Sequence, residues 1–300
     1  MKKFIKRLLL FLSPLLLIFI CGEIRLRTIN SYYKQKINGL KKSGSEIQIL
    51  ILGSSHTGSD CNPEYFSRPA FNMGFGWQNF YYDQKILGKE LDNMPKLKYV
   101  ILDVSYHNFY NSNYSVRSYF YKYYYDIDPF QKESFWKQNL SHFLFLYDPA
   151  TAFQVMFSRN QVLTCGFEKQ DTTMHEFLTD SWGKNKVALW REWSDQSGSS
   201  FDVNKVILEQ MIETIQKRGI TPVLVTPTLS SYVNKYLEKS ISEKNHRVYD
   251  ELVTRYHVPY FDLENASGFT DEDFYDMDHL NLKGSIKFTK ILDSLINQYH

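Results

Sequence analysis

The segment IQILILGSSHT, from Ile47 to Thr57, joins a mainly aliphatic run to a glycine, two serines and a histidine. A short continuous apolar run that is bounded by turn residues is typical of a strand buried on both faces. We therefore predict a strand at Ile47–Leu52. Polar side chains follow it at once, so this buried strand ends in groups that can form hydrogen bonds or react.

Similar strands alternate with helical patterns along much of the chain. Further apolar runs stand at Tyr99–Val104, Ile220–Val225 and Val258–Asp262, and helical spacing of apolar residues is seen at 79–91, 203–215, 248–256 and 288–296. Parallel strands need long crossovers, and the crossovers cover the sheet. We predict a three-layer α/β fold, in which a parallel sheet has helices on both faces. Ligand sites in such folds lie at the carboxyl ends of the strands, where GSSHT stands.

The interval from about 105 to 200 breaks this alternation. It is dense in aromatic residues, as in YFYKYYYDIDPF at Tyr119–Phe130. We predict a mainly helical insertion here and favour a satellite core beneath loops over a ligand platform. A place at a membrane interface, where tyrosine and tryptophan are enriched, is the alternative. The predicted organisation is an anchor or signal at 1–29, a polar linker at 30–45 and the α/β domain at 46–300.

The N-terminus predicts export with a retained anchor. Lys2, Lys3, Lys6 and Arg7 precede an uncharged stretch from Leu8 to Gly22. That stretch is shorter than the ~20 residues of an ideal spanning helix, but Phe4 and Ile5 extend it if the basic side chains reach the headgroups. A cleaved signal peptide is the rival interpretation, and it lacks small residues before a cleavage point. We expect the main domain on the periplasmic or extracellular side of the membrane.

Charge and cysteine content limit the classes of partner and of covalent cross-link that the protein can have. The formal net charge of +2 and the lack of long basic runs beyond the first residues argue against a nucleic-acid partner. Of the three cysteines, Cys21 lies in the N-terminal apolar stretch, and Cys61 and Cys165 lie in the exported body. A disulfide between them and two small buried side chains are equally good interpretations.

The segment YDMDHLNLKG, Tyr275–Gly284, supplies a candidate acid–base pair. Asp276 and His279 stand three apart, so both side chains can project to one side. The carboxylate can then hold one imidazole nitrogen and leave the other free to take a proton from a hydroxyl. Ser55, at the mouth of the first strand, supplies that hydroxyl. The plainer alternative is a capping serine and a solvated pair that begins a helix.

Backbone donors for an oxyanion are predicted at Ser55 and at Gly74, which stands in the Asn72-Met73-Gly74 turn of the segment FNMGFGW. A turn that needs positive φ explains Gly74 equally well. His56 follows the serine directly, and adjacent side chains on an extended segment point in opposite directions. We therefore interpret His56 as a pocket-lining or hydrogen-bonded residue, not as the catalytic base. Asp276, Asp278 and His279 lack a second cluster to complete a metal site, so we expect neither metal nor cofactor.

These residues carry a resemblance to a known superfamily. The blocks G-S-S at Gly53–Ser55, N-x-G at Asn72–Gly74 and D-x-x-H at Asp276–His279 resemble blocks one, two and five of the SGNH, or GDSL, hydrolases, in the same order. The resemblance implies a flavodoxin-like sheet, with Ser55 as nucleophile, His279 as base and Asp276 as its orienting partner. It also implies Gly74 as an oxyanion donor and Asn72 as a substrate-lining residue.

Two blocks depart from the pattern. Ser54 stands where block one usually has aspartate, and Asp103-Val104-Ser105-Tyr106-His107-Asn108 stands where block three usually has G-x-N-D. Either Ser105 or Asn108 is expected to replace the missing asparagine donor. Loss of one oxyanion donor typically costs about 100-fold or more in rate. A slow or inactive enzyme is therefore one expectation.

The anchor and the closing D-x-x-H-L-x-x-x-G are similar to D-alanyl transfer proteins of teichoic acid assembly and to their relatives in exopolysaccharide acylation. This resemblance implies an esterase or O-acyltransferase that acts on a surface glycan through an acyl-serine. It also implies a multi-spanning membrane acyltransferase as partner. The sequence leaves hydrolysis and transfer open. The competing hypothesis is an inactive anchored protein that binds glycan.

Overall fold

The computed structural model describes residues 2–111, 118–128, 143, 149–157, 163–196 and 198–299. The chain divides into two compact units. One comprises Met1–Gln35 and Arg117–Val162, and the other comprises Lys36–Val116 and Leu163–His300. The predicted insertion at 105–200 is thus divided, because its first part, up to Val116, and its last part, from Leu163, belong to the unit of the sheet.

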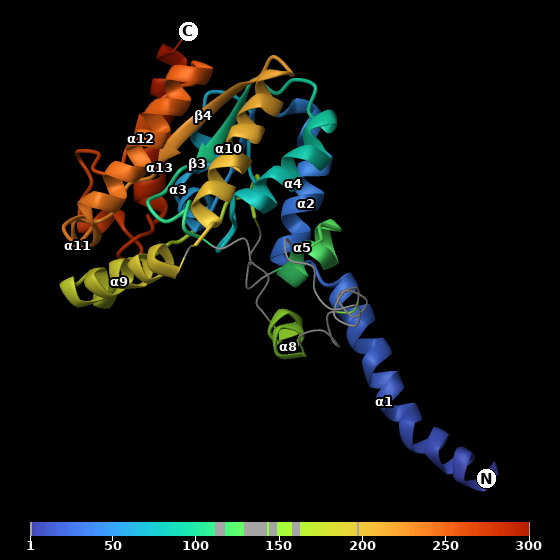
Figure 1. Cartoon of the computed structure of the whole chain (residues 1–300). Helices are drawn as coiled ribbons and strands as arrows, with labels where there is room; N and C mark the ends of the chain where they lie inside the picture. Colours follow the sequence, from blue (N-terminus) through green and yellow to red (C-terminus); the bar gives the residue numbers. More distant parts are fainter. Residues whose placement is uncertain are drawn as a thin grey trace. The chain divides into compact units, whose positions relative to one another are not determined.

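The second unit is built on a five-stranded parallel sheet (Figure 1). Its strands are β1 (Ile49–Leu52), β2 (Ala70–Asn72), β3 (Tyr99–Asp103), β4 (Thr221–Thr226) and β5 (Tyr260–Asp262). They lie in the order β2-β1-β3-β4-β5, and Ile51 of β1 pairs with Asn72 on one side and Ile101 on the other. This is the flavodoxin-like order, in which the chain reverses direction across the sheet beside β1. The predicted fold class is confirmed.

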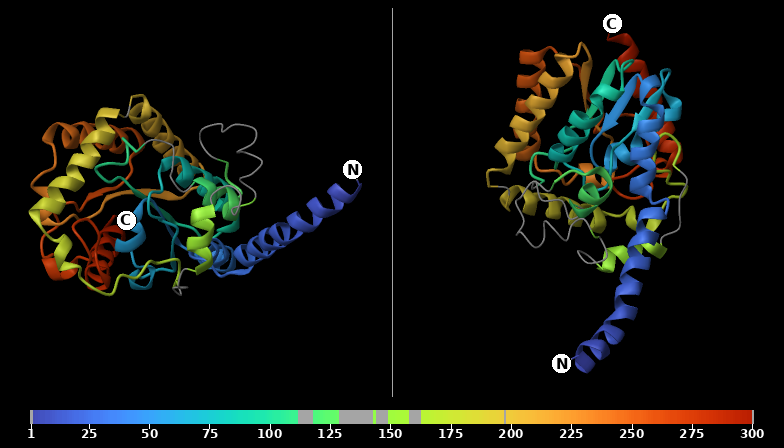
Figure 2. Two further views of the ribbon diagram at one scale, coloured as in Figure 1. Left: turned by 90° about the horizontal axis from the view of Figure 1, so that it is seen from below. Right: turned by 90° about the vertical axis from the view of Figure 1, so that its right-hand side faces the viewer.

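Helices cover both faces of this sheet (Figure 2). Ile49 and Ile51 point into a core that includes Phe288 and Leu292. Leu50 lies between them in sequence and is equally buried, on the opposite face. The helices of this unit are α3 (Ser55–Asp60), α4 (Phe80–Glu90), α9 (Asp180–Gln196), α10 (Ser200–Gln216), α11 (Ser231–Asn234), α12 (Lys239–Tyr256) and α13 (Leu282–Gln298). Because β1 and β3 are covered on both faces, they read as uninterrupted apolar runs.

Two elements beside β1 were not anticipated. The polar stop after β1 is the short helix α3, and the FNMGFGW segment begins with the edge strand β2. Both elements are short, at 6 and 3 residues, so neither repeats an apolar spacing often enough to be recognised.

The expected linker at 30–45 is a helix, α2 (Tyr32–Ser43). Tyr33, Ile37 and Leu40 are buried, and their spacing places them on one face. Lys36 is also fully buried, and its ammonium donates to the carbonyl oxygen of Gly74. The lysines that made the segment look like a solvated linker therefore include one that is structural.

The first unit contains α1 (Lys2–Thr28), α5 (Ser118–Tyr125) and α8 (Pro149–Phe157). Tyrosines of α5 pack on the end of α1 and the start of α2. The Tyr123 hydroxyl donates to Glu23 at 3.1 Å, and the Tyr125 hydroxyl donates to the carbonyl of Tyr33 at 3.1 Å. For Phe120–Tyr125 this packing agrees with the satellite core that we favoured; the Tyr119 side chain, Phe130 and most of the following residues up to 148 lie outside the described part.

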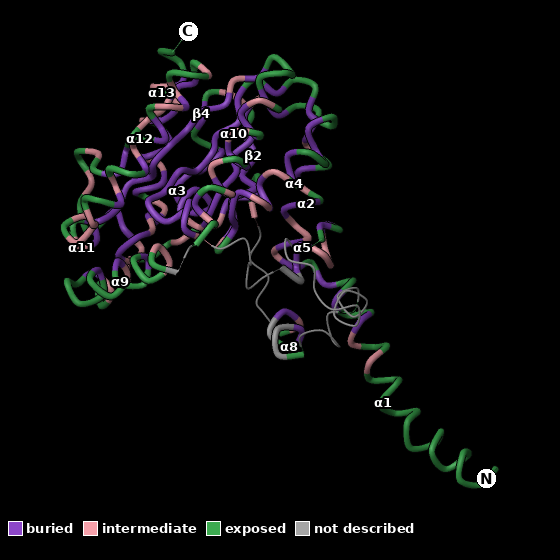
Figure 3. The backbone as a smooth tube through the Cα atoms, in the orientation of Figure 1, coloured by how far each residue is buried: buried purple, intermediate pink, exposed green. Residues whose placement is uncertain are grey.

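Helix α1 is exposed along nearly all of its length before Glu23 (Figure 3). Among the described residues it is the one helix that is long and apolar enough to cross a membrane. Its 27 residues span about 40 Å, compared with a hydrocarbon core of about 30 Å. The helix is compatible with a membrane anchor.

Candidate active site

The site lies where β1 and β3 end. β1 ends at Leu52, and Gly53 turns the chain with a φ of 136°. A Cβ on Gly53 would lie 2.2 Å from the Cβ of Asp103, so only glycine fits this turn. The turn makes Ser55 the first residue of α3.

Asp103 explains why a buried strand ends in hydroxyl groups. One carboxylate oxygen accepts hydrogen bonds from the Ser54 amide at 2.9 Å and the Ser54 hydroxyl at 2.6 Å. The other oxygen accepts from the Ser105 amide at 2.9 Å and from the Ser105 hydroxyl. A buried carboxylate needs several donors to remain stable. Ser54, which stands where the SGNH hydrolases that the sequence resembles usually have aspartate, is therefore a structural residue that joins β1 to β3.

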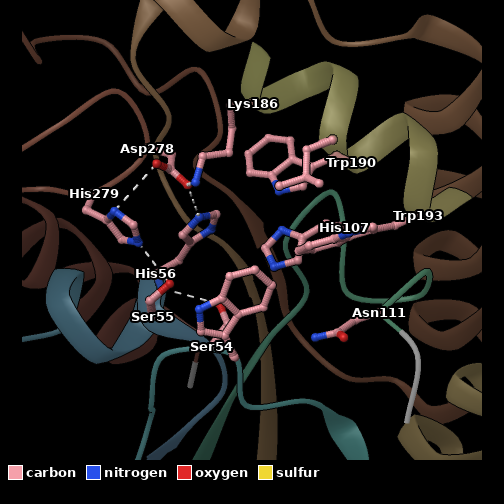
Figure 4. A pocket seen from close by; sticks show the side chains of 12 residues that line it. Ser54, Ser55, His56, His107, Asn111, Lys186, Trp190, Trp193, Asp278 and His279 are labelled. Atoms are coloured by element: carbon pink, nitrogen blue, oxygen red, sulfur yellow. Dashed lines mark hydrogen bonds and ion pairs between the residues drawn. The ribbon is translucent and has the colours of Figure 1, made fainter. Parts of the chain in front are cut away.

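Ser55, His279 and Asp276 form a continuous hydrogen-bonded chain. The Ser55 hydroxyl oxygen lies 2.8 Å from Nε2 of His279 (Figure 4). Nδ1 of His279 lies 2.9 and 3.1 Å from the two carboxylate oxygens of Asp276. This is the arrangement of a nucleophile, a base and a carboxylate that orients the base. The structure thus brings together the three residues that the sequence singled out for catalysis.

The turn that carries Asp276 and His279 is fixed to α3. The amide of Leu280 donates to the carboxylate of Asp60 at 2.9 Å, and Asp60 is the last residue of α3. Within the turn, the amide of Tyr275 donates to the carbonyl of His279 at 2.8 Å. The first bond joins segments 220 residues apart in sequence, and the second closes the turn. They hold the imidazole over the start of α3, where Ser55 lies.

His56 belongs to a second buried chain beside the first. Its Nδ1 lies 2.9 Å from the Ser105 hydroxyl, and its Nε2 lies 3.3 Å from a carboxylate oxygen of Asp278. The ammonium of Lys186 lies 2.9 Å from the same oxygen. Both imidazole nitrogens are engaged, so His56 is a hydrogen-bonded residue that lines the pocket, as expected. The expected reason was wrong, because Ser55 and His56 lie on a helix and not on an extended segment.

Asp278 sets the charge of this region. Burial opposes its ionisation, but His279, Lys186 and His56 together hold its pKa well below the usual range. Burial also opposes the charged form of His279, yet the carboxylates of Asp278 and Asp276 outweigh it and raise the pKa of His279 to about 9. The resting His279 is therefore protonated at neutral pH, and its basic form grows as the pH rises.

The expected oxyanion donors are arranged differently from the expectation. The amide of Gly74 donates to the side-chain oxygen of Asn72 at 2.8 Å, and the Asn72 amide group donates to the carbonyls of Thr57 and Cys61. Asn72 is fully buried. Neither residue lines the pocket at Ser55. The structure gives both a scaffolding role, in which Asn72 ties β2 to α3.

Ser105 and Asn108 do not fill the missing position either. The Ser105 hydroxyl is held between Asp103 and His56. The Asn108 side chain donates to the carbonyl of Asp103 at 2.8 Å. Of the expected donors, the Ser55 amide remains, since the first amides of a helix have no partner within the helix. Asn111 is the nearby amide side chain that does line the pocket (Figure 4).

The pocket at Ser55 has a wall that the sequence did not reveal. The hollow holds about 510 Å³ of space free of atoms, part of it open to solvent. Helix α9 contributes Lys186, Trp190 and Trp193, whose spacing places them on one face (Figure 4). Trp77 and His107 complete the aromatic part of the lining. The helical spacing of the α9 residues was a usable signal, but nothing in the sequence indicates which cavity a helix face borders.

Three residues of the pocket, His56, Asp278 and His279, lie close enough together to be considered as metal ligands. They are the one such group in the described part of the chain. The ligand atoms of His56, Asp278 and His279 lie within 4.8 Å of one another. The Lys186 ammonium lies 2.9 Å from Asp278, and Nε2 of His279 faces the Ser55 hydroxyl. A cation is thus already present beside the carboxylate. This donor set does not suit a metal ion.

Cys61 and Cys165 are both free thiols. Cys61 is buried at the end of α3, whereas Cys165 is exposed. The interpretation as a small buried side chain therefore describes Cys61 and not Cys165.

Comparisons with known proteins show distant likenesses only. No protein-family model matches the chain, and no curated protein matches its sequence. Among solved structures, the chain is similar to a GDSL-like lipase from Bacteroides thetaiotaomicron, at 10% identity and a TM-score of 0.42 over 89% of this chain and 97% of the other. It is also similar to an aryl esterase of M. smegmatis, at 10% identity and a TM-score of 0.38 over 84% and 99% of the two chains. The fold assignment rests on the strand order of this chain itself.

Proposed function

We propose that this protein is a membrane-anchored serine esterase or O-acyltransferase that acts on acyl esters of a surface glycan. The observation that carries the proposal is the 2.8 Å contact between the Ser55 hydroxyl and Nε2 of His279, with Asp276 on Nδ1. A serine hydroxyl is a weak nucleophile unless a positioned base removes its proton. The contact supplies that base.

The reaction uses the basic form of His279. The Ser55 oxygen attacks the ester carbonyl carbon while its proton passes to Nε2 of His279. The tetrahedral intermediate then collapses, its carbon–oxygen bond to the alcohol breaks, and the alcohol leaves with the proton from His279. Asp276 stabilises the imidazolium formed between these two steps, and the Ser55 amide lies at the start of α3, where it can donate to the oxyanion.

The acyl-serine is then consumed by an oxygen nucleophile. With water the outcome is hydrolysis, and with a sugar hydroxyl it is acyl transfer. In both cases His279 takes the proton of the attacking hydroxyl and returns it to Ser55. The same residues serve either acceptor, so the reaction class extends to both.

The surface-glycan substrate is supported by two features. Helix α1 is long and apolar enough to anchor the chain, and the basic residues in its first two turns favour export of the following domain. The G-S-S form, the anchor and the closing D-x-x-H-L-x-x-x-G resemble exported transfer proteins of envelope polymers. A transferase of this kind needs an acyl group delivered across the membrane, so the proposed partner is a multi-spanning acyltransferase.

A second function is favoured by the arrangement of the oxyanion donors. The Gly74 amide donates to Asn72, and the side chains of Ser105 and Asn108 are directed elsewhere. With fewer donors, the site loses about 100-fold in rate for each one missing. The alternative is an anchored glycan-binding protein whose serine site is vestigial.

Ester hydrolysis by the purified full chain in detergent separates the two. We expect release of acetate from a short-chain acetyl ester at pH 9, and a loss of about 1,000-fold or more in kcat for Ser55→Ala. Ser294→Ala, an exposed serine of α13, is the matched control and should retain wild-type activity. Equal rates for wild type and Ser55→Ala would leave only the binding function. In cells, the ester content of the surface polysaccharide after deletion of the protein tests the substrate class.

A further inference from the structure

Trp77 stands out among the residues that line the pocket. It has a φ of 66°, in the left-handed region that bulky residues rarely adopt, and its side chain is 45% exposed. A large apolar side chain that is both strained and exposed to solvent gains little stability from its position. Strain of this kind persists mainly at ligand-binding and catalytic sites. Trp77 therefore has the features of a contact residue for a ligand.

Trp77 forms a pair with Trp193. The two ring centroids lie 5.3 Å apart, with an angle of 53° between the planes. A flat ring inserted between two aromatic faces needs a separation of about 7 Å, twice the ordinary carbon–carbon contact of about 3.5 Å. The two indoles already touch, so they form a platform and not a clamp. A ligand would stack on their outer faces.

The pocket beside this platform is polar. His107 is buried, lines the pocket, and its Nδ1 has no hydrogen-bond partner among the described residues. Asn111 and Lys186 line the same pocket. The side-chain nitrogens of these two residues can donate hydrogen bonds to the hydroxyl groups of a ligand. An alkyl chain could cover the indoles but has no hydroxyl group for these donors.

A sugar ring meets both requirements. One face of a pyranose exposes C–H groups, whose partial positive charge is attracted to the negative face of an indole. Its edge carries hydroxyls that can bond to Asn111 and Lys186. The geometry points to a sugar residue stacked on Trp77 and Trp193, with its ester or its acceptor hydroxyl directed at Ser55. This inference rests on the proposed function, because it names the part of the glycan that the same site binds.

The test compares three acetyl esters with the full chain in detergent: 6-O-acetylglucose, cyclohexyl acetate and vinyl acetate. Cyclohexyl acetate has a ring of similar size without hydroxyls, and vinyl acetate has no ring. We expect wild type to prefer the sugar ester to cyclohexyl acetate. In Trp77→Ala, the ratio of kcat/KM for the sugar ester to that for vinyl acetate should fall about tenfold, mainly through KM.

Trp182→Ala is the matched control. Trp182 lies on the same helix as Trp193 and is 44% exposed, but it does not line the pocket. In Trp182→Ala the ratio of kcat/KM for the sugar ester to that for vinyl acetate should stay at the wild-type value. Trp77→Phe should keep part of the preference for the sugar ester. A ratio unchanged in Trp77→Ala, or a wild-type preference for cyclohexyl acetate, would overturn the inference and leave the esterase intact.

A binding measurement makes the inference independent of turnover. In the Ser55→Ala background, 6-O-acetylglucose should still quench tryptophan fluorescence, and adding Trp77→Ala should weaken its binding about tenfold. Binding that is the same with and without Trp77 contradicts the platform. If hydrolysis does not depend on Ser55 but binding of the sugar ester depends on Trp77, the proposed esterase activity would be wrong and the proposed sugar site would stand.

Discussion

At the scale of single residues, Asp278 has the largest influence on the site. It lies between His279, His56 and Lys186, and it stands 3.5 Å from Nδ1 of His279 in addition to the orienting Asp276. Two carboxylates on one imidazole stabilise the imidazolium more than one does. This site therefore holds its base mainly in the protonated form at neutral pH.

The pH dependence of catalysis follows from that charge. Because the reaction needs neutral His279 and its pKa is about 9, kcat/KM should rise about tenfold per pH unit below 9 and level off above it. Asp278→Asn removes a negative charge, so the rising part of the pH–rate profile should shift to lower pH. Lys186→Met removes a positive charge and should shift it to higher pH. A profile that is flat from pH 6 to 9, or shifts of the same sign in both variants, contradicts this account.

The same group affects stability with a definite sign. The pKa of His279 is raised in the folded state relative to about 6.5 in the unfolded chain. Its contribution is fully present below pH 6.5 and is lost as the pH rises to about 9. The wild-type Tm should therefore fall across this range by more than that of His279→Gln. An equal fall in both proteins would show that another group is responsible.

Trp77 allows a stability test of backbone strain. Glycine adopts positive φ without cost, whereas other residues lose about 1 kcal/mol or more there. Trp77→Gly should therefore be about 1 kcal/mol more stable than Trp77→Ala in urea denaturation. Equal stability of the two variants would mean that the turn relaxes.

At the scale of elements, helix α9 forms one wall of the pocket and depends on close packing against α11. A Cβ on Gly183 of α9 would lie 1.9 Å from the carbonyl oxygen of Tyr232. Gly183→Ala must therefore move α9 and with it Trp190 and Trp193. We expect a loss of about 2 kcal/mol in the free energy of unfolding and a lower kcat/KM for sugar esters.

Gly88 in α4 is the matched control for Gly183. Nothing lies within 4 Å of a Cβ built there, so Gly88→Ala should stabilise the protein by about 0.5–1 kcal/mol through helix propensity. If both substitutions have the same effect, close packing of α9 does not control the pocket.

The elements also show what the sequence can and cannot predict. The strands β1, β3 and β4 were predicted because strands covered on both faces leave apolar runs in the sequence. Ser55, Asp276 and His279 were predicted as site residues because they stand at the ends of such elements. The use of the Gly74 amide by Asn72 was missed because backbone donors leave no trace in side-chain patterns. The α9 wall was missed because the partner of a helix face depends on tertiary packing. Helix α2 was taken for a linker because its lysines masked the stripe of Tyr33, Ile37 and Leu40.

At the scale of the whole molecule, the proposal joins an anchor to a catalytic unit. We predict that the full chain stays with the membrane after an alkaline carbonate wash, because α1 is long and apolar enough to cross a bilayer. A C-terminal alkaline phosphatase fusion should be active, since that reporter functions only after export. Release by carbonate, or a mature N-terminus that lies beyond α1, would show a cleaved signal peptide instead.

The most direct test of the central claim is covalent labelling of the full chain with a fluorophosphonate, followed by peptide mapping by mass spectrometry. The account predicts one adduct, on Ser55, formed faster at pH 9 than at pH 7, slowed by at least about 100-fold in His279→Gln and absent in Ser55→Ala. Labelling at another serine, or no label on Ser55 at pH 9, would contradict it.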